Sequence, residues 1–298
     1  MLSGNIALVY TKLNNFSDAM IFTEKSIRIL GHYKGKTDLD ISKAMHTKGL
    51  IFLDTGKYKQ AYKIFEKVLK THREIFGNNH PDIASVLINI GSIYYYQGYY
   101  EKGLDYYKKA LQIRKSIYGE KHREIYTTLL NIGAIYTNLL KLDKAQSIYN
   151  DALKIGTELL GKDNVYMSFL YNNMGDNYFR MKDYKNAYKY LILALDLFKK
   201  FLGEEHNYTA MTLNNLGSIY FYTGKMKKAE TFYLKSLNIR LKCLGPDHIE
   251  TGQSYTCLGD YYIKAGNKKK AREFYSNAIR VAEKNNDKEA IESLNKKI

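Results

Sequence analysis

The stretch that decides the fold is "LNNLGSIYFYTGKMKKAETFYLKSL", Leu213–Leu237, in which a basic turn separates two segments with helical spacing. The first segment carries Leu213, Leu216, Gly217 and Tyr220, and the second carries Ala229, Tyr233 and Ser236, a spacing that continues to Ile239 just beyond the stretch. Mostly apolar or small residues at i, i+3, i+4 and i+7 form one stripe along an α-helix. Gly224 stands where such a helix commonly ends. The stretch therefore predicts two amphipathic helices joined by a tight turn.

The glycine of the first predicted helix recurs at steps of 42 residues through the whole chain. Its seven positions, the first taken by alanine, are Ala7, Gly49, Gly91, Gly133, Gly175, Gly217 and Gly259. A fixed period of this length is typical of a stacked repeat protein. We number each repeat so that this glycine is position 8. Small residues at positions 8 and 20 then let two helices approach closely, and aromatic residues at positions 11 and 24 fill the space beside them.

The period predicts one solenoid domain over residues 1–298, because the units of a solenoid contact only their neighbours. The predicted repeats span residues 1–35, 36–77, 78–119, 120–161, 162–203, 204–245 and 246–284. Residues 286–298 depart from the pattern, and their apolar face predicts a C-terminal capping helix. The first repeat begins part-way through the pattern, as in a fragment of a longer chain, and the sequence leaves open whether an N-terminal effector or coiled-coil region is lacking.

Histidines recur in the connectors between repeats, as His80, His122, His206 and His248. Packed helices are already about 8–10 Å apart, whereas zinc ligands must each reach within about 2.1 Å of one ion. We therefore expect no metal site. Instead, Asn79 or His80 is expected to cap the next helix, with Pro81 in its first turn.

No stretch of the sequence carries a convincing catalytic pattern. "GHYKGKT", Gly31–Thr37, resembles a phosphate-binding loop, but three residues instead of four separate its glycines. Gly35 also belongs to the periodic connector glycines. The sequence contains no HExxH, GxSxG or paired CxxC pattern. It therefore predicts a protein that is not an enzyme and that binds no cofactor.

The bulk composition bounds the compartment and the partners. No apolar run approaches the roughly 18–20 residues of a membrane-spanning helix. Cys243 and Cys257 fall in different repeats and make no disulfide framework, so we expect free thiols in a cytoplasmic protein. The net charge of +16 and the pI near 9.4 make nucleic acid or another acidic surface an alternative partner.

The repeat resembles the tetratricopeptide repeat in its 42-residue form, as found in kinesin light chains. The resemblance rests on "LNNLGSIY", "GKMKKAETFYLKSLNIR" and "LGPDH", and it extends over essentially the whole chain. It implies an all-α fold, a right-handed α-solenoid of about seven helix pairs. It also implies that the first helix of each pair lines a concave groove, and that the protein is a scaffold or adaptor.

Positions 2, 6, 9 and 13 of each first helix lie opposite the core stripe, because each residue turns the helix by about 100°. We call these the groove positions. In the second to seventh repeats they carry Lys43, Lys264 and Arg180 against Asp54, Asp176 and Asp260, so their charges cancel. The excess positive charge therefore lies elsewhere, on turns such as "GKMKKA" and "GNKKKA". A nucleic-acid groove would be basic, so nucleic acid is an unfavoured partner here.

Asparagine dominates position 6 of four consecutive repeats, as Asn89, Asn131, Asn173 and Asn215, with Asn172 and Asn214 beside two of them. An amide both donates and accepts hydrogen bonds, so such a row can hold the main chain of an extended peptide. The neighbouring residues predicted to form side-chain pockets are Tyr96, Asn138, Asp176, Phe179, Arg180, Phe221 and Tyr222. Hydrogen bonds between repeats are the alternative role of the asparagines, and the two roles can coexist.

These observations predict a non-enzymatic scaffold or adaptor that binds an extended peptide segment in its groove. Arg180 is expected to select an acidic residue of that peptide. By resemblance, adaptation of cargo to a motor is the more particular expectation. Two alternatives stay open: binding of nucleic acid or an acidic surface through the basic turns, and a regulator that senses signal peptides.

Overall fold

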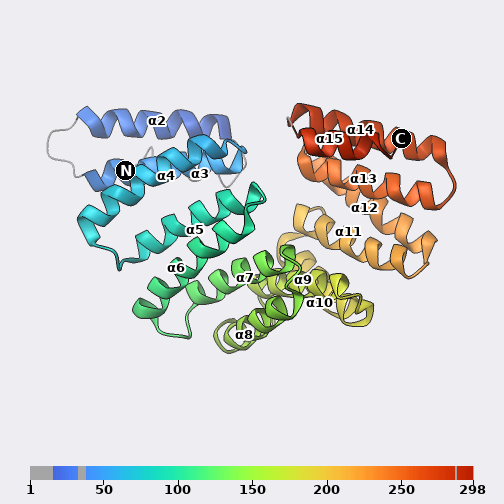
Figure 1. The fold of residues 1–298 in the computed structure, drawn as a ribbon, viewed down its shortest axis with the longest axis horizontal. Coiled ribbons are helices and arrows are strands. Elements are labelled where there is room, and N and C mark those ends of the chain that lie inside the picture. The colour runs from blue at the N-terminus through green and yellow to red at the C-terminus, as the bar shows by residue number, and fades with distance from the viewer. Residues whose placement is uncertain (1–15, 33–37, 286, 298) are drawn as a thin grey trace. The chain divides into compact units, whose positions relative to one another are not determined.

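A computed structural model describes residues 16–32, 38–285 and 287–297, and the regular secondary structure of these residues is entirely α-helical (Figure 1). The helices are α2 (Phe16–His32), α3 (Asp38–Asp54), α4 (Tyr58–Phe76), α5 (Pro81–Tyr96), α6 (Tyr100–Tyr118), α7 (Arg123–Asn138), α8 (Leu142–Leu160), α9 (Val165–Arg180), α10 (Tyr184–Leu202), α11 (Asn207–Tyr222), α12 (Met226–Cys243), α13 (Ile249–Lys264), α14 (Lys268–Lys284) and α15 (Lys288–Asn295). Ala7, and most of the loop-like stretch Gly31–Thr37, lie outside the described residues.

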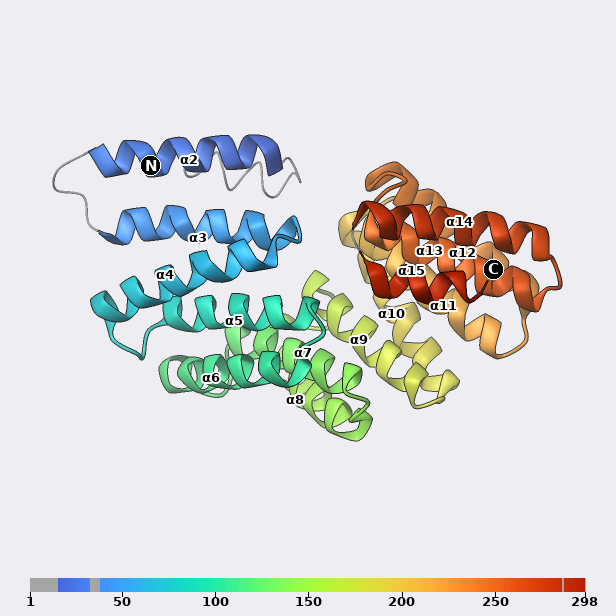
Figure 2. The same ribbon diagram turned by 45° about the horizontal axis from the view of Figure 1, so that its top comes forward.

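The helices repeat with the period that the sequence predicts. The first helices of five repeats, α5, α7, α9, α11 and α13, each contain 16 residues. Each begins 42 residues after the one before it. Helices α5, α9, α11 and α13 each pack against the longer second helix that follows, as α5 and α6 do in both views (Figures 1 and 2). The prediction of repeated helix pairs is confirmed.

Close contact between the paired helices depends on the small residues at positions 8 and 20. A Cβ atom added to Gly133 would lie 2.3 Å from Cε1 of Tyr149, a distance that real Cβ contacts do not reach. Tyr149 and Ala145 are both 0 % exposed. The tyrosine at position 24 thus lies directly on the backbone of the first helix, so the glycine is a packing requirement.

The chain divides into two compact units, residues 1–151 and residues 152–298. The first unit contains α2 to α7, and its core includes Phe65, Ile83 and Ile90. The second contains α9 to α15, and its core includes Leu258 and Tyr275. Helix α8 begins in the first unit and ends in the second. The single solenoid domain with its repeat boundaries stays a prediction.

The connector histidines cap the first helices. Nδ1 of His80 accepts a hydrogen bond from the backbone N–H of Asp82 at 3.2 Å, and His122, His206 and His248 accept in the same way. Asn164 takes this role before α9. A cap of this kind satisfies a backbone donor that the helix leaves free. Of the two predicted caps for α5, His80 is the one used, and the side chain of Asn79 instead accepts from the hydroxyl of Ser116.

The last described helix, α15, lies against α14 (Figure 2). Its N-terminus is capped by Asp287, whose carboxylate accepts from the backbone N–H of Ala290 at 3.0 Å. Leu294 is 5 % exposed and joins the core of the second unit. Residues 287–297 therefore cover part of the last helix pair.

Candidate functional site

The predicted site residues all lie on the first helices of four repeats. Asn89 and Tyr96 lie on α5, and Asn131 and Asn138 on α7, all in the first unit. The second unit holds the rest: Asn172, Asn173, Asp176, Phe179 and Arg180 on α9, and Asn214, Asn215, Phe221 and Tyr222 on α11. The hydrogen bonds of these side chains separate residues that join repeats from residues that a ligand can use.

Two of the position-6 asparagines join neighbouring repeats. Nδ2 of Asn89 lies 2.9 Å from Nε2 of His46, and the ring nitrogen must accept because an amide NH2 only donates. Nδ2 of Asn215 donates to Oδ1 of Asn172 at 3.3 Å. In both pairs the partners are 43 residues apart, so position 6 of one repeat bonds to position 5 of the repeat before it.

The other two position-6 asparagines, Asn131 and Asn173, make no hydrogen bond through their side chains within the residues that the structure describes. The sequence explains the difference. Position 5 of the preceding repeat is Ile88 for Asn131 and Leu130 for Asn173, and neither side chain can accept a hydrogen bond. Both asparagines are half-buried, which leaves part of each amide accessible.

The paired asparagines Asn172 and Asn214 serve the packing of repeats. Asn172 is 5 % exposed and accepts hydrogen bonds from Thr212 at 3.2 Å and from Asn215. Nδ2 of Asn214 donates to Sγ of Cys257 at 3.5 Å, again with a separation of 43 residues. The sequence analysis gave hydrogen bonds between repeats as the alternative role of the asparagines, but it did not use position 5 of the preceding repeat to decide which asparagines take that role.

Asp176 and Arg180 form an ion pair on α9. Nε of Arg180 lies 2.9 Å from Oδ2 of Asp176, and their side chains are 37 % and 33 % exposed. In other repeats the position-9 side chain bonds to the position-24 tyrosine, as Asp260 does to Tyr275 at 2.6 Å. Leu191 occupies position 24 of the fifth repeat, so Asp176 has no tyrosine to hold. The pair is therefore accessible.

An aromatic cluster lies beside this pair at the C-terminal ends of α9 and α11. The ring centroids of Phe179 and Tyr222 are 5.4 Å apart, and those of Phe221 and Tyr222 are 5.3 Å apart. Tyr222 is 60 % exposed. Nζ of Lys264 on α13 lies 4.4 Å from the Phe221 centroid. The sequence analysis considered Lys264 only for its charge. Its contact with Phe221 was missed, although Lys264 follows Phe221 by the same 43-residue step.

The first unit has a comparable arrangement at the ends of α5 and α7. Tyr96 is 61 % exposed and stacks on Tyr58 with 6.1 Å between ring centroids. Nδ2 of Asn138 donates to the hydroxyl of Tyr95 at 3.0 Å. Asn138 thus helps to orient an aromatic residue. Tyr58 was missed because it begins a second helix, outside the groove positions.

Three features bound the chemistry of the described residues. Across residues 16–32, 38–285 and 287–297, no group of three or more His, Cys, Asp or Glu side chains is placed to hold a metal ion. None of the helices α2 to α15 is long and apolar enough to cross a membrane. Cys243 and Cys257 are free thiols, and burial raises the pKa of both. The site consists of amides, rings and one ion pair.

Paired helices of fixed period define a helical repeat protein of the α-solenoid class. The tetratricopeptide repeat family matches residues 40–116, 82–158, 124–184, 166–242 and 210–284, and the chain belongs to this family. No curated protein sequence matches the chain.

Solved structures of similar fold share little sequence with the chain. The Rap conjugation gene regulator of the plasmid pLS20, in complex with the Phr* peptide, has a TM-score of 0.74 at 14 % identity, over 95 % of this chain and 73 % of that one. The apo form of the quorum sensor NprR from B. thuringiensis has a TM-score of 0.65 at 16 % identity, over 94 % of this chain and 86 % of that one. BtubC (BKLC) from P. vanneervenii has a TM-score of 0.56 at 18 % identity, over 85 % of this chain and 94 % of that one. At these identities the likeness shows the fold alone.

Proposed function

We propose that this protein is a non-enzymatic interaction scaffold that binds an extended peptide segment along the groove positions of its first helices. In the second unit, the amide of Asn173 holds the peptide main chain. The Asp176–Arg180 pair recognises a charged side chain, and the rings of Phe179 and Tyr222 contact an apolar one. In the first unit, Asn131 and the exposed ring of Tyr96 take the corresponding roles.

One observation carries the proposal: in the second unit, Asn173, Asp176 and Arg180 are polar groove side chains that make no hydrogen bond or ion pair to another repeat among the described residues, as is true of Asn131 in the first unit. A single turn of helix separates Asn173 from Asp176, and another separates Asp176 from Arg180, so all three lie along one face. A carboxylate from a ligand can approach the guanidinium of Arg180, which has donors beyond the Nε that reaches Asp176. The peptide-bound Rap regulator, which has the same fold, adds support to peptide as the class of ligand.

Two finer roles extend the proposal. The likeness to kinesin light chain repeats favours an adaptor that joins a cargo peptide to a motor, and the likeness to Rap and NprR favours a regulator that responds to a signal peptide. In either role the protein acts in the cytoplasm, where reducing conditions keep Cys243 and Cys257 as thiols.

The experiment that tests the proposal begins with peptides selected from a random display library on the wild-type protein. The dissociation constant of a selected peptide is then measured by fluorescence anisotropy for the wild type, Asn173→Ala and Arg180→Ala. We expect a loss of about 5- to 10-fold for Asn173→Ala, because a hydrogen bond contributes about 1 kcal/mol. Arg180→Ala should weaken the binding of acidic peptides and leave the binding of neutral peptides little changed.

Asn238→Ala is the matched control for Asn173→Ala, because Asn238 is an exposed asparagine on a second helix of the same unit, α12. Arg272→Ala on α14 serves in the same way for Arg180. Equal losses in control and site variants would contradict the proposal. Affinity that collapses with salt for every anionic ligand, and depends on Arg272 instead of Arg180, would favour the basic turns as the binding surface.

A further inference from the structure

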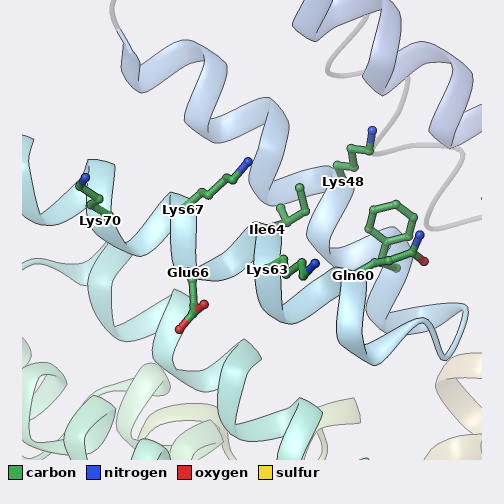
Figure 3. Close-up of a pocket in the computed structure, with 8 residues that line it drawn as sticks. Lys48, Gln60, Lys63, Ile64, Glu66, Lys67 and Lys70 are labelled. Atoms are coloured by element: carbon green, nitrogen blue, oxygen red, sulfur yellow. The ribbon is translucent and has the colours of Figure 1, made fainter.

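A surface cavity of about 650 Å³ lies between α3 and α4 in the first unit (Figure 3). The side chains that form it include Lys48, Phe52, Gln60, Lys63, Ile64 and Lys67. Phe52 is at position 11 of its repeat, on the core stripe of α3, so the cavity is separate from the groove positions. Its volume is in the range of pockets that hold small ligands.

The cavity lies where the second repeat lacks a ring that four of the five later repeats have; the fourth repeat, with Ile148 at the same position, also lacks it. In four of those repeats the aromatic residue at position 11 packs against an aromatic residue at position 23: Tyr94 with Tyr106, Tyr178 with Tyr190, Tyr220 with Phe232 and Tyr262 with Phe274. Their ring centroids are 5.2–5.5 Å apart. In the second repeat, position 23 is Ile64. Phe52 therefore has no stacking ring from α4.

The positive charge beside the same ring comes from a different position in the second repeat. At position 19 the ammonium groups of Lys102, Lys228 and Lys270 lie 4.9–5.7 Å from the centroid of the position-11 ring of their repeats. Gln60 takes this position in the second repeat. Lys48 compensates in part, because its Nζ lies 5.8 Å from the Phe52 centroid, but it also bonds to Glu24 at 2.7 Å.

The open space is bordered by two lysines that have no ion-pair partner among the described residues, Lys63 and Lys67. In Figure 3 the ammonium group of Lys67 extends toward Ile64, whereas the carboxylate of Glu66 points away from Lys48. Glu66 is engaged by a hydrogen bond from Tyr62, which raises the pKa of that phenol. The cavity thus combines an aromatic and aliphatic floor with unneutralised positive charge.

We propose that this cavity binds an aromatic group that carries a negative charge. The ring of the ligand stacks on Phe52 beside Ile64, where four later repeats place their own ring, and its anionic group pairs with Lys63 and Lys67. A free aryl phosphate and a phosphotyrosine side chain within another protein share this chemistry.

The direct test is isothermal titration calorimetry of the wild-type protein with phenyl phosphate, cyclohexyl phosphate and phenol. We expect saturable binding of phenyl phosphate, with the other two at least 10-fold weaker, because each lacks either the ring or the charge. Three equal affinities, or no binding of phenyl phosphate, would overturn the proposal. A phosphotyrosyl peptide that binds more tightly than phenyl phosphate would identify a protein partner as the source, and equal binding would identify a free small molecule.

Two variants locate the site. Ile64→Phe supplies the residue found at position 23 of the sixth and seventh repeats and keeps every lysine, so it should reduce phenyl phosphate binding at least 10-fold by filling the cavity. Lys67→Gln changes an exposed side chain that the fold does not need, and it should reduce binding about 5-fold. The matched control is Lys109→Gln, at the same position 26 of the third repeat, where Tyr106 already stacks on Tyr94.

Circular dichroism and thermal unfolding establish that each variant is folded. Lys67→Gln keeps the test decisive even if Ile64→Phe is destabilised by its larger side chain. Binding that survives both variants, or that Lys109→Gln reduces as much as Lys67→Gln, places the ligand elsewhere and overturns the proposal.

Discussion

Nδ2 of Asn89 and Nε2 of His46 lie 2.9 Å apart although 43 residues separate them in the chain. The same step joins Asn215 to Asn172. A residue at position 6 therefore bonds to the repeat before it whenever position 5 of that repeat carries an acceptor. The row of asparagines is thus divided by its neighbours into side chains that join repeats and side chains that remain accessible.

This division predicts effects of different size on stability for asparagines that are equivalent in sequence. Asn89→Ala should lower the free energy of unfolding by about 1 kcal/mol, because it leaves the half-buried ring of His46 without its donor. Asn131→Ala should change it by less than about 0.5 kcal/mol, as surface substitutions usually do. Urea denaturation followed by circular dichroism measures both. Equal losses would show that Asn131 also makes a structural hydrogen bond.

A second prediction concerns acid. Burial, followed by repulsion from His72, lowers the pKa of His46 from its ordinary value of 6.5 to about 4. Above pH 6.5 the imidazole is neutral in the folded and unfolded states, and stability is complete. Between pH 6.5 and 4 the unfolded chain binds a proton that the folded chain does not. Stability should therefore fall over this range, by up to about 3 kcal/mol.

Denaturation of the wild type and of His46→Gln from pH 7.5 to 4 tests this prediction. Glutamine keeps an acceptor for Asn89 but does not titrate, so its stability should fall less between pH 6.5 and 4. His72 adds to the wild-type slope in the same direction, because burial lowers its pKa and neither of its ring nitrogens has a partner among the described residues. Parallel curves for the two proteins would rule out His46 as a source of acid sensitivity.

A third prediction follows from the turn inside each repeat, at position 15. This position has positive φ in every repeat from the second to the seventh, and glycine fills it in four of them: Gly56, Gly98, Gly224 and Gly266. Leu140, with φ of 56°, and Lys182, with φ of 63°, are the exceptions. A side chain in this left-handed region costs about 1–2 kcal/mol. Glycine avoids this strain, but it also makes the unfolded chain more flexible, and that flexibility offsets about 0.5–1 kcal/mol of the gain.

Lys182→Gly should therefore raise the free energy of unfolding by up to about 1 kcal/mol, the difference between these two effects. Lys189→Gly is its control, because Lys189 is an exposed residue in the interior of α10 and the same substitution there should cost about 1 kcal/mol. Thermal unfolding midpoints distinguish the two signs. A decrease in both variants would mean that Lys182 makes a favourable contact that outweighs its backbone strain.

The sequence predicted the helix pairs because small and aromatic residues at positions 8, 11, 20 and 24 can occupy only one side of a helix. It also predicted the histidine caps, because their spacing excluded a shared metal ion. It did not separate the two roles of asparagine, since an amide suits a peptide as well as a neighbouring repeat. The cavity beside Phe52 was also missed, because Ile64 is as apolar as the rings at position 23 of four later repeats, and an apolar pattern does not show where space is left.

The last prediction concerns a buried arginine that joins two repeats of the first unit. Arg114, on α6, is 6 % exposed, and its Nη1 donates to the backbone oxygen of Glu124 at 3.0 Å and to Oγ1 of Thr128 at 2.7 Å. Its Nη2 pairs with the carboxylate of Glu124. Arg240 makes the equivalent bonds to Glu250 and Ser254 in the second unit.

Arg114→Met should lower the free energy of unfolding by about 3 kcal/mol, because it keeps the length of the side chain but leaves the carboxylate of Glu124 without its partner. The stability of Arg114→Lys should lie between that of the wild type and that of Arg114→Met, since one ammonium group cannot reach all three acceptors of the guanidinium. Urea denaturation of Arg114→Met, Glu124→Gln and the double variant gives the coupling energy of the pair. The losses of the two single variants should be far from additive. In the double variant, Glu124→Gln removes the negative charge that Arg114→Met leaves without a partner. Additive losses would mean that Arg114 acts through its bonds to the backbone and Thr128 alone, and that the ion pair contributes nothing to the junction between the repeats.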